Sequence, residues 1–303
     1  MGSRSRTLFR HWAFSGVIGQ VAVILFDGFA FGMLLFVLSV GLSVTLGLMN
    51  FTNLAHCAFG MLGGYTAVIL IRSVGLPFLL TLPAAFLVAA LVAIVLERSI
   101  FRLLYGAGEL NQVLLTIGVV FVAAAAAAYL FGTGQQPIRL PSFLHGSFEF
   151  GGQRFGVYRS FLSVVAICIA AILVLGLDYT RFGARVRAAV DNQRVAQGLG
   201  IDVDKVFAVT FALGGGLAGL GGALAIEIVG LDPSFGFHYL VYVLIVVAIG
   251  GLGSIGGSFV AAAMLGIVDV AGKYLVPEIG SFLIYLMLVA ILFVRPLGLF
   301  GRR

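Results

Sequence analysis

Three polar residues lie close together inside a long apolar stretch in the first part of the chain. Asn50, Asn53 and His56 fall within the run 28–71, which contains no charged residue. Polar groups at the depth of a membrane are costly unless they are paired or face a cavity. Two interpretations remain open: these side chains line the path of a polar solute through a broken helix, or they cap helix ends at the membrane surface.

The most strongly charged part of the chain is residues 178–205. Residues 183–197 predict one short helix, which Thr180 begins and Gly198 and Gly200 end. Its thin apolar face is expected to hold Val186, Val190 and Val195. Such a helix can lie on a membrane surface, but the many small residues around that face favour close docking against another protein.

Acidic residues near the later apolar runs could couple an ion gradient to transport. Glu227 and Asp232 are expected at the solvated end of a helix, whereas Asp269 lies deeper. Lys273 follows Asp269 by one helical turn, so the sequence predicts a structural ion pair between them.

The segment Gly251–Gly256 matches the G-x-G-x-x-G fingerprint of dinucleotide-binding proteins. Apolar runs of membrane-spanning length flank it, so we expect a tight turn between two spans rather than a nucleotide site. The sequence contains no Walker A motif, no H-E-x-x-H and no G-x-S-x-G. Cys57 and Cys168 belong to no cysteine–histidine cluster. We therefore predict that the chain is not an enzyme and has no metal site, no catalytic residue and no bound cofactor of its own.

Composition identifies the elements that position these residues. Apolar residues make up 61% of the chain and charged residues 10%, whereas a soluble domain has about 25% charged residues. A spanning helix needs about 20 apolar residues. We therefore predict an all-α, polytopic transmembrane bundle with about eight spans, or nine if residues 13–26 also cross, in one domain over 1–303. The apolar runs are 28–71, 73–96, 110–138, 160–177, 206–226, 233–268 and 279–294.

Alternation of the spans places the loops. If residues 180–201 form a cytoplasmic loop, then 97–109, 250–257 and the C-terminal tail lie on the same side, where Lys and Arg are in excess. That excess explains the net charge of +6 without nucleic acid as a partner. Residues 133–159 become the longest external loop, which either covers the mouth of a pathway or simply connects two spans.

Several segments resemble, in their order along the chain, the permease subunits of the branched-chain amino-acid uptake family of ATP-binding-cassette importers, the LivH type. RFGARVRAAVDNQRVAQGLGI at 181–201 is similar to the coupling loop, whose short helix sits in a cleft of the ATPase subunit. The resemblance covers roughly 28–302. Its other segments are GLMNFTNLAH at 47–56, ERSIFR at 97–102, GGLGSIGG at 250–257 and RPLGLFGR at 295–302.

The resemblance implies a multi-pass permease of the bacterial cytoplasmic (inner) membrane that moves branched-chain or related amino acids by alternating access. Its implied partners are a related second permease, two cytoplasmic ATPase subunits that hold ATP and Mg²⁺, an external solute-binding protein and membrane lipid. The positions carried over for coupling to the ATPase are Gly183, Arg187, Ala188, Asp191, Ala196 and Gly200.

One departure from the family concerns the cargo. The family usually continues after the equivalent of His56 with Gly-Glu, whereas Cys57 and Ala58 stand here. An alternative cargo is therefore urea or another short amide, or a small organic or aromatic acid. Two rival classes are an ion-coupled secondary transporter that uses Asp269 and a stand-alone channel for urea, ammonium or water.

Overall fold

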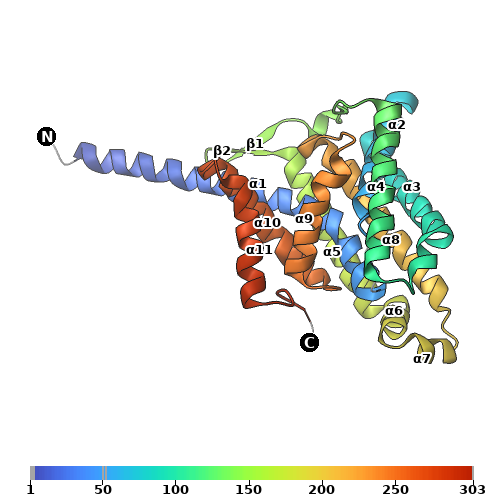
Figure 1. Ribbon diagram of the computed structural model, residues 1–303. Coiled ribbons are helices and arrows are strands. Elements are labelled where there is room, and N and C mark those ends of the chain that lie inside the picture. The colour runs from blue at the N-terminus through green and yellow to red at the C-terminus, as the bar shows by residue number, and fades with distance from the viewer. Residues whose placement is uncertain (1–3, 50, 52, 302–303) are drawn as a thin grey trace.

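The computed structural model describes residues 4–49, 51 and 53–301, and most of them are helical (Figure 1). The predicted all-α membrane bundle is confirmed, with one small antiparallel hairpin as an addition. The helices are α1 Arg4–Met49, α2 His56–Ile69, α3 Phe78–Ser99, α4 Glu109–Phe131, α5 Val157–Tyr179, α6 Arg181–Asp191, α7 Gln193–Gly198, α8 Val203–Val229, α9 Phe235–Gly250, α10 Ile255–Leu275 and α11 Leu283–Val294; the strands are β1 Ser147–Phe150 and β2 Gln153–Gly156.

Seven helices of the described part of the chain are long and apolar enough to cross a membrane, and two shorter apolar helices accompany them. The prediction of about eight spans falls between seven, the number of long spans in the described residues, and nine, the total when the two shorter helices are included. The runs 28–71 and 233–268, which are too long for one helix each and are interrupted by Asn or Gly, divide into two helices each. Residues 13–26 form no span of their own, because they are part of the unbroken helix α1. The long spans are Gly19–Gly47, His56–Val74, Phe78–Ser99, Glu109–Phe131, Val157–Tyr179, Val203–Val229 and Ile255–Leu275.

Helix α8 lies at the centre of the bundle, against α1, α2 and α3. Glycines allow its backbone to touch its neighbours: a Cβ atom on Gly222 would lie 1.8 Å from the carbonyl oxygen of Gly60 in α2. A second close contact joins α10 to α1: a Cβ on Gly266 of α10 would lie 2.2 Å from the amide nitrogen of Gly32 of α1. Close approach of this kind holds helices together where lipid removes the hydrophobic drive.

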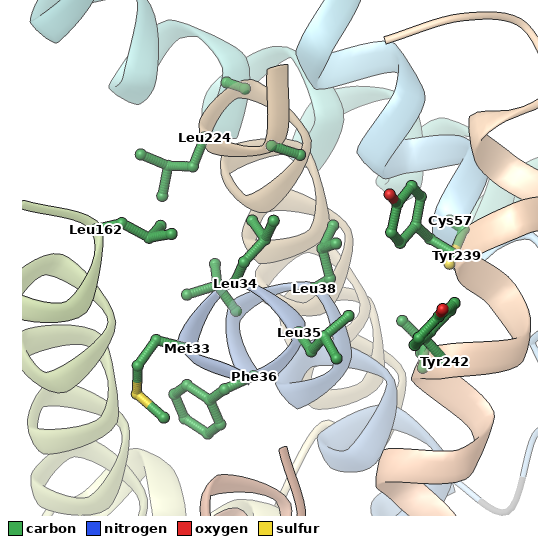
Figure 2. Close-up of a cluster of buried hydrophobic side chains, with 14 of the residues drawn as sticks. Met33, Leu34, Leu35, Phe36, Leu38, Cys57, Leu162, Leu224, Tyr239 and Tyr242 are labelled. Atoms are coloured by element: carbon green, nitrogen blue, oxygen red, sulfur yellow. The ribbon is translucent and has the colours of Figure 1, made fainter. Parts of the chain in front are cut away.

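The apolar core surrounds the middle of α1. Leu34 and Leu38 of α1 lie close to Leu224 of α8, and two tyrosines of α9, Tyr239 and Tyr242, border the cluster (Figure 2). Some polar side chains pair within the core: the Ser258 hydroxyl of α10 donates to the Ser43 hydroxyl of α1 at 2.8 Å. Such a pair satisfies both groups in a low-dielectric interior, whereas the buried Tyr65 hydroxyl has no hydrogen-bond partner among the described residues.

The two ends of the bundle carry different segments. One, the α6–α7 end, gathers residues 97–109, 178–203, 250–257 and 295–301, as alternation predicts; Arg102 forms an ion pair with Asp204, and the Leu299 amide donates to the Ile249 carbonyl at 2.7 Å. Figure 1 shows α6 and α7 together at the edge of the bundle.

The other end, the hairpin end, carries β1 and β2, the start of α5 and the C-terminal ends of α2, α8 and α10. Here Arg72, just beyond α2, donates to the Gln136 side chain at 2.8 Å, which ties the end of this helix to the segment between α4 and α5. Phe155 of β2 packs edge-on against Phe26 of α1 at 5.0 Å between ring centroids. The first part of α1 projects from the bundle at this end (Figure 1).

Candidate functional site

The charged segment between α5 and α8 forms two short helices rather than the single helix predicted over 183–197. Thr180 begins α6 as predicted, its hydroxyl oxygen accepting from the Gly183 amide at 3.3 Å. The helix ends at Asp191 because Asn192 is extended (φ −157°, ψ 101°). The Asn192 side chain then accepts from the Val195 amide at 3.1 Å and begins α7. The prediction of one continuous helix was wrong, because an internal asparagine competes with the helix as a cap.

The break changes which residues face the bundle. Val186 is buried as predicted, together with Gly183 and Ala189. These side chains pack on the first turns of α8 through Val203, Val206 and Phe207. Val195, predicted on the same face, is instead 57% exposed. The buried face of the segment is therefore smaller than the sequence pattern indicates, and more of the segment's surface is free to contact another molecule.

The residues predicted to couple this chain to an ATPase fall into two groups. Gly183 and Ala196 are buried within the chain, and a Cβ on Gly183 would lie 1.8 Å from the Leu177 carbonyl oxygen. They hold α6 and α7 against the bundle. Arg187, Asp191 and Gly200 are exposed and Ala188 is half-buried, so these four are accessible to a partner.

Arg187 has contacts of its own. Its guanidinium donates to the Leu177 carbonyl at the end of α5 and lies 3.9 Å from the Asp178 carboxylate. About half of the side chain remains exposed. Arg187 is therefore positioned by α5 and presents its charge at the surface, where it can respond to a movement of α6 relative to the spans.

A cavity of about 750 Å³ separates α6 from the turn between α9 and α10. Arg187 and Asp191 line one side, and Leu252 and Ile255 line the other, with Phe300 of the C-terminal tail beside them. Leu252 is 60% exposed and Leu199, at the end of α7, is 76% exposed. Sequence reasoning missed both leucines, although each stands alone between two glycines of a turn, where it has no helix to pack into.

The connection from α3 to α4 supports the same end of the bundle. The Tyr105 hydroxyl donates to the Glu97 carboxylate at 2.8 Å, and its ring packs edge-on against Phe207 of α8. Burial and the neighbouring Glu97 raise the pKa of Tyr105, so the phenol stays protonated and serves as a donor. This contact joins α3, α8 and the neighbourhood of α6 and α7.

The predicted solute-pathway residues are placed only in part. Asn50 lies outside the described residues. Asn53 is buried, and its side-chain oxygen accepts from the Ala55 amide at 3.1 Å just before α2. The His56 Nε2 atom lies 2.9 Å from the Leu38 carbonyl oxygen of α1. In this conformation His56 therefore ties the start of α2 to α1, and Asn53 holds the turn that precedes α2.

Two further expectations concern charged and glycine-rich segments. Asp269 pairs with Lys273 at 2.6 Å, which confirms the predicted ion pair. Residues 251–254 form a tight turn between α9 and α10, with positive φ at Gly251 and Gly253, as expected. Among the described residues, no group of three or more His, Cys, Asp or Glu side chains could hold a metal ion.

Comparison with known proteins places this arrangement in a family. Residues 24–292 match the family described as the branched-chain amino acid transport system permease component. No solved structure matches the fold. The match covers the α6–α7 segment, six of the seven long spans of the described residues in full, and most of the first, Gly19–Gly47.

Several curated proteins are similar to the chain along nearly all its length. The high-affinity branched-chain amino acid transport system permease protein LivH of Salmonella typhimurium is 26% identical, over 92% of this chain and 94% of that protein. BraD of Pseudomonas aeruginosa is 25% identical over 92% of this chain and 95% of its own. LivM of Salmonella typhimurium is 25% identical, over 88% of this chain and 68% of that protein. The chain is a multi-pass membrane protein that belongs to the branched-chain amino acid ABC permease family.

Proposed function

We propose that this chain is the permease subunit of an ABC importer that carries branched-chain or related amino acids across the bacterial inner membrane. The single observation that carries the proposal is a short two-helix segment, held on the bundle by a small buried face, that presents charged and apolar side chains outward within a chain of this permease family.

The proposed mechanism is alternating access driven from outside the chain. The sequence has no Walker A motif, so ATP and Mg²⁺ would be held by two cytoplasmic ATPase subunits. When they close, α6 and α7 would move with the docking cleft and change which side of the membrane the pore faces. Coupling of this kind requires that the partner contact the segment differently in the two states. Arg187, Ala188, Asp191 and Gly200 are the accessible docking positions.

The remaining partners follow from the relatives. LivH and LivM are both similar to this chain, which supports a pore made of two related permeases. An external solute-binding protein would deliver the cargo to the hairpin end and determine much of the specificity. Asn53 and His56 are proposed to move into contact with the solute path when α2 shifts against α1, since His56 joins these two helices and Asn53 lies in their connection.

Co-purification tests the proposal. The tagged chain, extracted in mild detergent, is expected to bring down a related permease and a subunit with a Walker A motif, and the complex is expected to hydrolyse ATP. In proteoliposomes that hold the full complex, the lumen corresponds to the cytoplasm. These vesicles should accumulate L-leucine only when ATP is inside the lumen and the binding protein is outside. Uptake by this chain alone in vesicles would refute the proposal and favour a channel or an ion-coupled carrier.

A further inference from the structure

A second pocket lies at the hairpin end, far from α6 and α7. It has a volume of about 260 Å³ and is lined by residues of α1, α5, α8, α9 and α10. Pockets for drug-sized ligands begin at roughly 300 Å³, so this space suits a solute of amino-acid size. Five helices therefore converge on a small pocket whose lining includes no residue of α6 or α7.

Two ion pairs form the polar part of this pocket. Asp27 of α1 pairs with Arg159 of α5 at 2.5 Å, and Asp269 pairs with Lys273 of α10 at 2.6 Å. The carboxylate side chains are 8% and 2% exposed, whereas the side chains of Arg159 and Lys273 are 42% and 48% exposed. The acidic groups thus lie deep in the pocket, and the cationic groups reach the solvent.

The rest of the lining suits a solute with a neutral, apolar body. The Tyr242 hydroxyl donates to the second oxygen of Asp269 at 3.2 Å, which fixes that carboxylate. Aliphatic residues of α8 and α10, Ile228, Val229 and Val270, form a wall, and Phe31 of α1 lies under the Lys273 ammonium group. The pocket therefore offers charges of both signs beside an apolar surface.

Stability alone does not account for this arrangement. A buried ion pair adds little stability compared with apolar residues of similar size, because removing both charges from water is costly. Ionisable residues inside a membrane bundle commonly mark a solute pathway. The Asp269 carboxylate holds a cation, Lys273, whose side chain is half-exposed, so a single ammonium group from outside can replace it without leaving a buried charge unpaired.

We propose that this pocket binds a zwitterionic solute, as an external site of the transport pathway. The solute's ammonium group takes the place of the Lys273 ammonium group at the deep carboxylate of Asp269. Its carboxylate contacts the released Lys273 side chain and the half-exposed guanidinium of Arg159, which keeps its ion pair with Asp27. Its aliphatic side chain packs on Ile228, Val229 and Val270. The amino-acid class of this ligand rests on the proposed function. The headgroup of phosphatidylethanolamine has the same pair of charges, so the test must separate these two sources.

Direct binding provides the test. The assembled transporter is placed in nanodiscs of phosphatidylglycerol without ethanolamine lipid and without the external binding protein, and radiolabelled L-leucine is titrated. We expect saturable binding that unlabelled L-leucine displaces. Isovalerate, which lacks the ammonium group, and isoamylamine, which lacks the carboxylate, are expected to displace it poorly.

Variants separate a binding site from a structural ion pair. Asp269→Asn and Arg159→Gln are each expected to weaken L-leucine binding by about tenfold or more, because each removes a charge-assisted hydrogen bond. The double variant Asp269→Asn/Lys273→Met removes the pair without leaving a lone charge, so a purely structural pair would tolerate it. We expect it to remain defective in binding although the complex still assembles. Glu149→Gln, in the exposed hairpin pair with Arg154, is the matched control and should bind normally.

Several outcomes would overturn the inference. Unchanged L-leucine binding in both single variants, or normal binding in the double variant, would assign the pairs a structural role. If wild-type discs bind no L-leucine, and phosphatidylethanolamine co-purifies with the wild type but not with Asp269→Asn, the lipid headgroup is the occupant. ATP-driven uptake by the complete system tests the proposed function separately: uptake with an unchanged KM in Asp269→Asn would reject this site and leave the importer proposal intact.

Discussion

Helix α8 and the α6–α7 segment are neighbours in the chain but lie in opposite environments. Most of α8 is buried, and its glycines place its backbone against α1 and α2. The α6–α7 segment keeps only a small face on the bundle and exposes charges together with Val195 and Leu199. Contacts within the chain explain the residues of α8, whereas the proposed ATPase partner would account for the exposed residues of α6 and α7. The structural role and the proposed coupling role therefore lie on consecutive elements, and mutations can separate them.

The largest effect is expected in α8. In Gly222→Val the new side chain would meet the Gly60 backbone of α2, and because backbone cannot move aside as a side chain can, the cost should exceed the roughly 1–3 kcal/mol typical of overpacking. We expect loss of the monodisperse complex by fluorescence-detected size exclusion. Gly176→Val in α5, where no atom lies within 4 Å of the added Cβ, is the control. A well-folded Gly222→Val protein would show that α8 is not tightly packed.

The next effect concerns docking by α7. Leu199→Ala removes an exposed apolar side chain that would be buried by the ATPase, so association should weaken by about tenfold, from roughly 1.5 kcal/mol of lost burial. The measurement is the affinity of the ATPase subunit for nanodisc-embedded permease. Leu130→Ala makes the same change at the end of α4 near the hairpin end and should leave this affinity unaltered. Equal affinities for both variants would remove Leu199 from the interface.

A third effect tests the junction between the two regions. Tyr105→Phe leaves the buried Glu97 carboxylate without the hydroxyl that donates to it, at a cost of roughly 1–3 kcal/mol. Thermal unfolding of the purified complex should shift to lower temperature. Tyr179→Phe removes the hydroxyl of a largely exposed tyrosine at the end of α5, and its unfolding temperature should equal that of the wild type. A Tyr105→Phe protein as stable as the wild type would mean that Glu97 finds another donor.

The smallest effect is local to α6. Thr180→Ala removes the side-chain cap of that helix, which costs about 1 kcal/mol. Amide hydrogen exchange should accelerate in residues 181–191 and stay unchanged in α8. Thr180→Ser keeps the hydroxyl and should restore the wild-type rates. If exchange accelerated equally in α8, the two regions would unfold together and the separation drawn between them would fail.

Local patterns predicted much of this structure. Run length and composition predicted the helical bundle, and interruptions by Gly or Asn indicated that both long runs divide. One-turn spacing predicted the pair of Asp269 with Lys273, and residue type predicted the cap at Thr180. Each of these depends on neighbours within one or two helical turns, which a sequence displays directly.

Other features depended on competition or on distant contacts. The break at Asn192 was missed because the helical pattern runs through it on both sides. An asparagine can either continue a helix or cap a new one, and the pattern does not distinguish these two roles. The hairpin was missed although Gly151-Gly152, both with positive φ, is a recognised turn signal between alternating residues. The pair of Asp27 with Arg159 joins α1 to α5, and only the packing of the helices reveals it.

The ratio of ATP hydrolysed to solute imported tests the central claim most directly. Arg187→Glu/Asp191→Arg exchanges two exposed charges of α6 and leaves the buried face of the segment intact. In proteoliposomes that hold the complete complex, we predict continued ATP hydrolysis with uptake reduced by about tenfold or more, since the segment no longer follows the ATPase. Normal uptake at the wild-type ratio would contradict the assignment of α6 and α7 as the coupling element.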